Sequence, residues 1–279
     1  MMKKLLLVDG SNLLFQMFYG MPSRIINKEG KPIQGILGFV GALLKIIKAI
    51  SPSHICILFD GEHENPRKAI QREYKANRPD FSTLPEEETP FSQLEGIYKA
   101  LALLKIPFKE LTDYEADDYI ASYTALYQDE MQIVISSWDS DYFSLIHDNV
   151  TIYRYKGKKS YFCDEAYLRQ KLHIQPKQYI FHKALVGDPS DHILGIPKIG
   201  IATASKIVNT YSTIQELYEK GCLEVYYKYL IGYKEQIEEN YKLISFYKIN
   251  SLPFSIDELI CPSISMTTNQ ILKELLILN

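Results

Sequence analysis

Three carboxylates crowd one short stretch of the sequence, T-D-Y-E-A-D-D-Y at residues 112–119, where Glu115, Asp117 and Asp118 lie within four positions. Thr112 and Glu115 fit a capping box at a helix start, where acids also favour the positive end of the helix dipole. Capping explains Glu115 and one aspartate. It does not explain the second, because neighbouring carboxylates repel one another. A helix cap and a metal site are therefore both open interpretations of this stretch.

Six more aspartates follow predicted strands or a glycine: Asp9, Asp60, Asp139, Asp141, Asp188 and Asp191. The first two stand in Asp-Gly pairs, which are common turns, so either pair alone is more simply structural. Four of the six come after short aliphatic runs at 5–8, 55–59 and 133–135, which predict buried parallel strands. Helical patterns at 36–50 and 94–104 lie between these runs. The alternation predicts an α/β fold with a parallel sheet.

The carboxyl ends of parallel strands open on one edge of the sheet, where such folds bind ligands. A helix start near Asp113 and the G-D-P-S-D segment at 187–191 add to that edge, so we expect nine carboxylates to converge there. So many anions need cations, and oxygen ligands without His or Cys select Mg²⁺ or Mn²⁺. The excess of carboxylates predicts two ions, about 4 Å apart, an arrangement that serves in-line phosphoryl displacement. This favours the metal interpretation of residues 112–119.

The segment E-N-P-R-K-A-I-Q-R-E-Y-K-A-N-R-P, residues 64–79, supplies the opposite charge. Asn-Pro at its start and a proline at its end bound a predicted helix. Its cations face a single acid, Glu73, and they are Arg67, Lys68, Arg72, Lys75 and Arg78. Lys68, Arg72 and Lys75 follow i, i+4, i+7 spacing and would share one helix face. A solvated charged helix is the simpler alternative, but the shortage of acids favours a phosphate-facing stripe.

A second candidate for phosphate binding is the turn Gly195-x-Pro197-x-x-Gly200, which stands ahead of a helical pattern. Glycines permit a tight turn that presents backbone N–H groups and a helix N-terminus to a phosphate. A plain joint between two helices is the alternative.

Composition leaves nucleic acid open as a partner. The formal net charge is −3, from 31 Lys and Arg against 34 acids. If nine acids serve a metal site, the rest of the surface is basic. A hydrophobic content of 46% and a charged content of 23% are typical of a soluble globular protein. The N-terminal apolar run is too short for a signal peptide, and Lys45 and Lys48 interrupt the longest apolar segment, so no membrane span is expected. Four cysteines without a C-x-x-C pair indicate a reduced, cytoplasmic protein.

Six motifs follow one another between residue 5 and about residue 210. They are V-D-G-S at 8–11, F-D at 59–60, Y-K-A-N-R at 74–78, Y-E-A-D-D at 114–118, D-S-D at 139–141 and G-D-P-S-D-H-I-L-G-I-P-K-I-G at 187–200. In order and spacing they resemble the bacterial 5′–3′ exonuclease and flap endonuclease family. The same fold forms the N-terminal 5′ nuclease domain of bacterial DNA polymerase I.

The resemblance implies an α/β nuclease core at 1–175, with a helical arch near 64–92 through which a 5′ strand passes. It also implies a helical DNA-binding region at 176–279, with a helix–hairpin–helix near 187–208 that grips duplex DNA and commonly binds K⁺. The C-terminal sequence T-N-Q-I-L-K-E-L-L-I-L predicts a closing amphipathic helix. A monomeric, free-standing enzyme without a polymerase is expected.

The resemblance also implies roles for individual residues. The first metal site would be held by Asp9, Asp60, Glu115, Asp117 and Asp118, and the second by Asp139, Asp141, Asp188 and Asp191. Tyr74, Lys75 and Arg78 match arch residues that contact the scissile phosphate. Phe15 falls where the family often has a tyrosine that stacks on the terminal base. Further DNA contacts are expected from Arg67, Lys68 and Arg72 in the arch and from Gly195, Lys198, Gly200 and Lys206 at the hairpin.

Four positions depart from the family pattern. Gln16, Trp138, Ser140 and Ala202 stand where many members have arginine, glycine, lysine and lysine. No metal position is lost, so we expect hydrolysis of DNA near 5′ ends, flaps or nicks with two Mg²⁺ or Mn²⁺ ions. The alternatives are a branched-DNA-binding protein with weakened catalysis and an RNA-cutting nuclease on a related core. Retention of all nine acids counts against the first, and the duplex-gripping hairpin counts against the second.

Overall fold

A six-stranded sheet forms the centre of the protein, in a computed structural model that describes residues 2–61, 66–71, 73–76, 81–220 and 225–277. The strand order is β3-β2-β1-β4-β5-β6, in which the first five strands are parallel and the last is antiparallel. The strands are β1 Lys4–Asp9, β2 His54–Asp60, β3 Phe108–Leu111, β4 Gln132–Ser136, β5 Val150–Arg154 and β6 Tyr161–Cys163. The expected parallel α/β sheet is confirmed.

The central strands are apolar along most of their length because both faces of the sheet are covered. In β1, Leu5 and Leu7 pack into the core on one face, and Leu6 and Val8 pack into the core on the other. All four side chains are fully buried. An uninterrupted apolar run therefore marks a strand that has no solvent-facing side.

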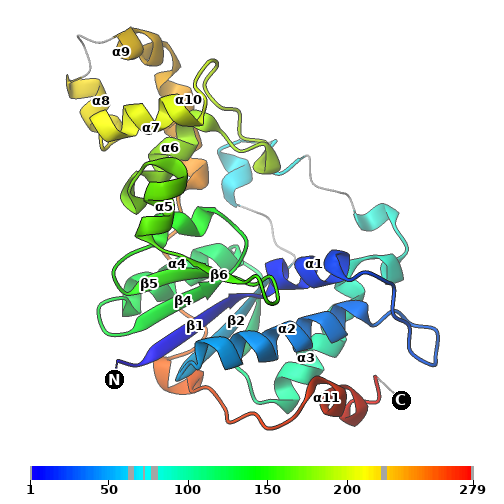
Figure 1. The fold of residues 1–279 in the computed structure, drawn as a ribbon. Helices are drawn as coiled ribbons and strands as arrows, with labels where there is room; N and C mark the ends of the chain where they lie inside the picture. The colour runs from blue at the N-terminus through cyan, green and yellow to red at the C-terminus, as the bar shows by residue number, and fades with distance from the viewer. Residues whose placement is uncertain (1, 62–65, 72, 77–80, 221–224, 278–279) are drawn as a thin grey trace.

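Helices cover the two faces of the sheet in separate layers (Figure 1). One face carries α1 Gly10–Gly20, α2 Gln34–Ile50, α3 Leu94–Leu103 and α11 Thr268–Glu274. The other face carries α4 Ala116–Tyr127 and α5 Glu165–Leu172. Beyond α5 rises a helical region of α6 Tyr179–Val186, α7 Ile201–Thr210, α8 Ile214–Lys220, α9 Val225–Leu230 and α10 Lys234–Ile244. The closing helix α11 packs against α2 and α3 of the core.

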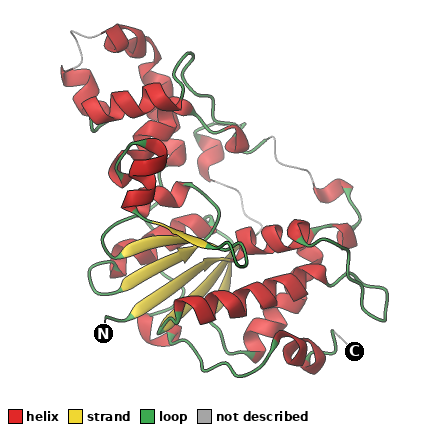
Figure 2. Ribbon diagram, in the orientation of Figure 1, coloured by secondary structure: helices red, strands yellow, loops and turns green. Residues whose placement is uncertain are grey.

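Short 3₁₀ helices connect these elements (Figure 2). They are η1 Pro66–Ala69, η2 Phe81–Thr83, η3 Glu86–Glu88, η4 Pro90–Gln93, η5 Asp141–Leu145, η6 Pro176–Gln178, η7 Pro189–Asp191, η9 Ile231–Tyr233 and η10 Ile256–Leu259. Four of them, η1 to η4, lie along the described part of the segment at 64–92, where an arch was expected. No helix in the described ranges is long and apolar enough to cross a membrane.

The predicted basic helix over 64–79 is wrong for the residues that the structure describes. Only η1 is helical there, and Lys75 has a positive φ of 58°, which an α-helix does not allow. The reason is tertiary, since Arg67 and Tyr74 are drawn into the interior. The prediction of a shared helix face is therefore wrong for Lys68 and Lys75. Arg72 and Arg78 lie outside the described residues.

Candidate metal centre and active site

Asp9 ends the central strand β1 and also caps the next helix. Its Oδ1 accepts a hydrogen bond from the Asn12 N–H at 2.9 Å, and its Oδ2 accepts one from the Ser137 hydroxyl at 3.0 Å. Burial, with repulsion from Asp60, raises the pKa of Asp9 to about 7. The turn therefore holds this carboxyl at the sheet edge in a site that disfavours its negative charge.

Asp60 ends the neighbouring strand β2 and caps a helix that begins 56 residues later. Its Oδ1 accepts a hydrogen bond from the Ala116 N–H at 2.8 Å, at the first residue of α4. Glu115 occupies the N-cap position of α4, yet its side chain makes no capping hydrogen bond. The capping box expected from Thr112 and Glu115 is therefore wrong. The Asp60 carboxylate, at the end of β2, caps α4 instead, and the Glu115 side chain makes other contacts.

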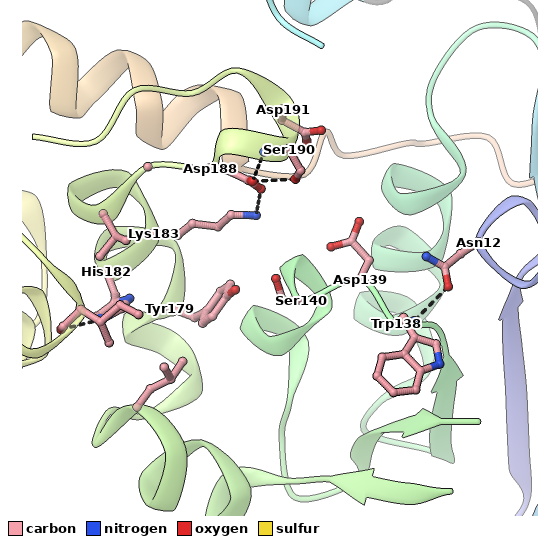
Figure 3. A pocket seen from close by; sticks show the side chains of 14 residues that line it. Asn12, Trp138, Asp139, Ser140, Tyr179, His182, Lys183, Asp188, Ser190 and Asp191 are labelled. Atoms are coloured by element: carbon pink, nitrogen blue, oxygen red, sulfur yellow. Dashed lines mark hydrogen bonds and ion pairs between the residues drawn. The ribbon is translucent and has the colours of Figure 1, made fainter. Parts of the chain in front are cut away.

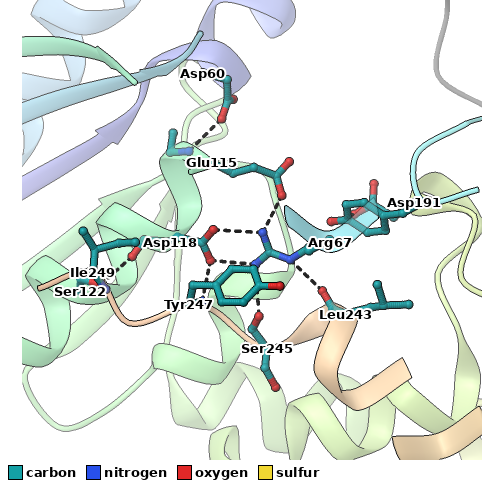
Figure 4. A network of polar contacts seen from close by, with 12 residues as sticks. Asp60, Arg67, Glu115, Asp118, Ser122, Asp191, Leu243, Ser245, Tyr247 and Ile249 are labelled. Atoms are coloured by element: carbon teal, nitrogen blue, oxygen red, sulfur yellow. Dashed lines mark hydrogen bonds and ion pairs between the residues drawn. The ribbon is translucent and has the colours of Figure 1, made fainter. Parts of the chain in front are cut away.

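The first acidic cluster consists of Glu115, Asp117 and Asp118. Each offers a carboxylate oxygen within 4.8 Å of the others. Asp118 is fully buried, and Glu115 is 8% exposed. The backbone places all three at the first turn of α4, and that turn faces the sheet edge where β1 and β2 end (Figure 4). The sequence prediction that these three acids lie together is correct in geometry.

Arg67 neutralises this cluster from inside the protein. Its guanidinium donates to the Glu115 carboxylate at 2.7 Å and to both oxygens of Asp118 at 2.7 and 3.0 Å. It also donates to the backbone carbonyls of Leu243 and Ser245 at 3.0 and 3.1 Å (Figure 4). The residue is 1% exposed, so the expected DNA contact of Arg67 is not available in this conformation.

Asp117 differs from its two neighbours. Its Oδ1 is buried and has no hydrogen-bond partner among the described atoms. Burial, with repulsion from Glu115 and Asp118, raises the pKa of Asp117 well above its ordinary value. An orphaned carboxylate oxygen in a group of three acids fits a site that holds a divalent cation, because the cation would supply the missing partner.

Lys75 reaches the same cluster from the segment after β2. Its ammonium pairs with Glu115, and its backbone N–H binds the Asp191 carbonyl at 3.1 Å. The neighbouring Tyr74 is 3% exposed, and its hydroxyl lies 3.4 Å from the Asp191 carboxylate. The pair therefore links the first acidic cluster to the second.

The second acidic cluster consists of Asp141, Asp188 and Asp191, again with carboxylate oxygens within 4.8 Å of one another. Lys183 on α6 pairs with Asp141. It also pairs with Asp188 at 2.5 Å, as Figure 3 shows. Burial opposes its charge, but the two carboxylates raise the pKa of Lys183 above its ordinary value. Sequence reasoning missed this residue. It stands five residues before Asp188, outside the motif at 187–200, and no local pattern in the sequence marked it.

Two adjoining cavities expose most of these acids. One, of about 460 Å³, is lined by Phe15, Lys68 and Lys75 together with Asp9, Asp60, Glu115, Asp117 and Asp139. The other, of about 440 Å³, is lined by Asp139, Asp188 and Asp191, so Asp139 belongs to both. Seven of the nine predicted carboxylates therefore face this paired cavity. Asp118 and Asp141 do not line either cavity, and their carboxylate oxygens accept hydrogen bonds from Arg67 and Lys183.

Aromatic packing fixes one wall of the site. Phe15 on α1 packs edge-on against Phe81 and Phe91, with ring centres 5.8 Å apart in each pair. Phe91 also lines the cavity that contains the first cluster. The predicted stacking residue is therefore at the cavity wall.

The turn before α7 is held by one glycine and left open at another. A Cβ on Gly195 would lie 2.0 Å from the Val186 carbonyl oxygen, so only glycine fits there. A Cβ on Gly200 would meet nothing within 4 Å, and Gly200 is the exposed N-cap of α7. Lys198, in the turn, and Lys206, on α7, are both exposed. The turn therefore presents an open helix start with two cations near it.

Comparison with known protein families identifies the family to which this chain belongs. The model of the 5′–3′ exonuclease N-terminal resolvase-like domain matches residues 4–173, and that of the 5′–3′ exonuclease C-terminal SAM fold matches residues 174–267. The chain belongs to the 5′–3′ exonuclease family. The resemblance expected from the sequence is confirmed, and so is the enzyme class, a 5′ nuclease.

Individual relatives agree with this assignment. The 5′–3′ exonuclease of Bacillus subtilis is 34% identical over 224 residues, which cover 77% of this chain and 73% of that protein. The 5′–3′ exonuclease of Aquifex aeolicus is 29% identical over 260 residues, covering 92% and 86%. DNA polymerase I of Caldicellulosiruptor bescii is 30% identical over 221 residues. They cover 77% of this chain, and the chain spans 25% of the polymerase.

Solved structures share the fold. The T5 5′-exonuclease with bound divalent zinc ions superposes with a TM-score of 0.70 at 22% identity, covering 87% of this chain and 89% of that one. The catalytic core of Rad2 in complex with a DNA substrate gives a TM-score of 0.55 at 16% identity, covering 99% and 88%. The expected fold class, a mostly parallel α/β core with a C-terminal helical region, is confirmed.

Proposed function

We propose that this nuclease hydrolyses DNA phosphodiesters near 5′ ends, flaps or nicks with the help of two divalent ions. The observation that carries the proposal is the convergence of seven carboxylates on a paired cavity at one sheet edge, in a chain of the 5′–3′ exonuclease family. The relatives solved with DNA, a phage flap endonuclease and Rad2, support DNA as the substrate class.

The donor set fits Mg²⁺ or Mn²⁺, because it consists of carboxylate oxygens without His or Cys. Asp9, Asp60, Glu115 and Asp117 would hold the first ion, with Asp118 behind them, and Asp139, Asp141, Asp188 and Asp191 would hold the second. Such ions lower the pKa of an attacking water and neutralise charge on the leaving oxygen. Lys183 would share or yield its two carboxylates when the second site is filled.

The chain's own residues would place the DNA. Lys75 and Lys68 project into the cavity of the first cluster, where they can bind the scissile phosphate. Phe15 offers a ring at the cavity wall for the terminal base. Arg72 and Arg78 belong to the same proposal, although they lie outside the described residues.

The helical region would bind the duplex. Gly200 and Lys198 present an open helix N-terminus and a cation, and Lys206 follows on α7. This arrangement suits a phosphate and, at the backbone carbonyls of the turn, a K⁺ ion. Gly195 would serve by closing the turn, since its backbone packs against Val186.

The decisive experiment uses Asp117, because its Oδ1 has no protein partner to lose. Labelled flap, nicked and single-stranded DNA and matched RNA are incubated with the protein, with and without Mg²⁺. We expect 5′-directed cleavage of DNA that requires Mg²⁺ and is abolished by Asp117→Asn. The matched control is Asp129→Asn, an exposed acid just beyond the far end of α4, which should cleave normally.

Two outcomes favour the rival functions. Tight flap binding without any metal-dependent cleavage would identify a branched-DNA-binding protein. Preferential cleavage of RNA would identify an RNA nuclease. The nine retained acids argue against the first outcome.

A further inference from the structure

The turn between β5 and β6 carries cations that the proposed function does not use. Lys156, Lys158 and Lys159 are all exposed, and the sequence has no acid between Asp148 and Asp164. None of the ion pairs found in the described part of the chain involves these three lysines. Their charge therefore faces solvent without compensation.

The lysine turn, residues 156–159, is well ordered by its own hydrogen bonds. Gly157 has a φ of +58°, which allows the tight reversal. The Lys159 N–H binds the Lys156 carbonyl at 3.1 Å, and the Ser160 hydroxyl accepts from the Lys156 N–H at 2.8 Å. The three ammonium groups are thus carried by a fixed backbone and do not depend on a loose loop.

Side chains near the metal centre anchor this turn. The Tyr155 carbonyl accepts hydrogen bonds from Gln16 Nε2 at 2.7 Å and from Trp138 Nε1 at 3.0 Å. The Lys156 ammonium lies 5.8 Å from the centre of the Trp138 ring. Gln16 and Trp138 are two of the positions that depart from the family pattern, and both serve to hold the lysine turn. Trp138 immediately precedes Asp139, which lies in both cavities.

The position of the lysine turn follows from strand direction. Strand β5 is parallel to β4, so its C-terminal end opens on the same sheet edge as the carboxylates. Figure 1 shows the turn beside α1, and the Gln16 hydrogen bond confirms that contact. The cavity of about 440 Å³ runs from Trp138 to Ile201, the first residue of α7 (Figure 3). The lysine turn and the hairpin before α7 therefore flank one cavity from two ends.

We propose that Lys156, Lys158 and Lys159 form a second DNA-binding surface. They would bind backbone phosphates of the substrate across the metal centre from the hairpin at 187–208. Carboxylates at the centre repel DNA, and exposed lysines beside them offset that repulsion where the strand passes. The inference rests on the proposed function, because it assumes that DNA occupies the paired cavity.

A charge-matched pair of variants tests the proposal. Lys158→Gln with Lys159→Gln removes two charges from the turn, and Lys45→Gln with Lys48→Gln removes two exposed charges from α2. Residues 45 and 48 lie near the end of α2 that leads into the start of β2, at the opposite sheet edge. Flap binding is measured by fluorescence anisotropy from 50 to 200 mM KCl, with Ca²⁺ in place of Mg²⁺ to prevent cleavage.

We expect the turn variant alone to lower the slope of log K against log salt by about 2, since each phosphate contact contributes about 0.9. Between 50 and 200 mM KCl this reduces the loss of affinity by about 12-fold. An unchanged slope, or an equal reduction in both variants, would overturn the proposal, since only long-range attraction would remain. Cleavage by the unaltered protein in Mg²⁺ is recorded in parallel, so failure of the proposed function is distinguished from failure of this surface.

Discussion

The two acidic clusters are neutralised by internal cations of different kinds. Arg67 comes from the segment after β2 and binds two carboxylates and two backbone carbonyls, one of them 176 residues away in the sequence. Lys183 comes from helix α6 and bridges Asp141 and Asp188. Arg67 therefore connects three distant parts of the chain, whereas Lys183 connects two acids of one cluster.

The two cations therefore have different roles. Arg67 holds distant segments of the chain together, whereas Lys183 occupies a position that a metal ion could take. Asp118 accepts two hydrogen bonds from Arg67 and one from the Tyr247 N–H at 2.7 Å, so its oxygens are committed to holding the chain. Lys183 instead places one positive charge between two carboxylates, where a divalent cation could also sit. Because the carboxylates of Asp141 and Asp188 are 13% and 14% exposed, the second cluster can exchange its cation more easily than the first.

The largest expected effect on stability comes from removing the Arg67 guanidinium. Arg67→Met leaves Asp118 buried without its partner, which costs about 3–5 kcal/mol of unfolding free energy. Lys183→Met removes hydrogen bonds to charged groups that keep some water, and about 1.5–3 kcal/mol is expected. Urea unfolding in the absence of divalent ions measures both. Equal losses of unfolding free energy in the two variants would contradict this difference between Arg67 and Lys183.

A double variant tests whether the unpaired charge of Asp118 causes the loss of stability in Arg67→Met. Adding Asp118→Asn to Arg67→Met removes the unpaired buried charge, so part of the lost stability should return. If the double variant is as unstable as the sum of the two single variants, the guanidinium acts through packing and its contacts with Leu243 and Ser245.

The next effect concerns Lys75, the second cation of the first cluster. Its side chain is 14% exposed and lines the cavity, so it can leave Glu115 and meet a phosphate. Negative charge builds on that phosphate in the transition state, where a fixed cation contributes most. Lys75→Ala should therefore lower the single-turnover rate on a saturating flap substrate by about 10²-fold. Lys68→Ala is the control and should mainly weaken binding; an unchanged rate in Lys75→Ala would show that this lysine only attracts DNA.

The sequence predicted the acids at the ends of the strands, but it did not predict the internal contacts of Arg67. Asp9, Asp60 and Asp139 were found because an aliphatic run that ends in aspartate is a local pattern, and strand direction brings such residues to one edge. Arg67 was placed wrongly, since its partners lie up to 178 residues away and no local pattern encodes that contact. The basic helix failed for the same reason: burial of Arg67 and Tyr74 overrides the helical propensity of the segment.

The helix cap of α4 gives a second example. The T-x-x-E pattern predicted a local cap, but Asp60 from β2 supplies it across 56 residues of sequence. Lys183 was overlooked although it stands five residues before Asp188, because a lone lysine on a helix has no distinctive spacing. Acids at strand ends could thus be predicted, and the ion pairs that Arg67 and Lys183 make with acids could not.

The most gradual expected effect is a change in the pH dependence of stability. Burial raises the pKa of Asp9 from its ordinary value of 3.8 to about 7, so the folded state keeps a proton that the unfolded state releases. Stability without divalent ions should therefore fall as pH rises from about 4 to about 7, by roughly 1 kcal/mol per pH unit for this one acid. Asp141, whose pKa burial also raises to about 7, adds a contribution of the same sign.

Asp9→Asn isolates the contribution of Asp9, because the amide cannot ionise. Its oxygen can still accept from the Asn12 N–H, and its NH₂ group can donate to the Ser137 hydroxyl oxygen in place of the bond that Asp9 accepts. Urea unfolding from pH 4.5 to 8 should show a flatter profile for this variant than for the unaltered protein. Millimolar Mg²⁺ should flatten the unaltered profile too, since a cation favours the ionised carboxyl in the folded state. If the two proteins have parallel profiles without metal, Asp9 is already ionised at low pH. Its charge would then be balanced within the site, as Lys183 balances the second cluster.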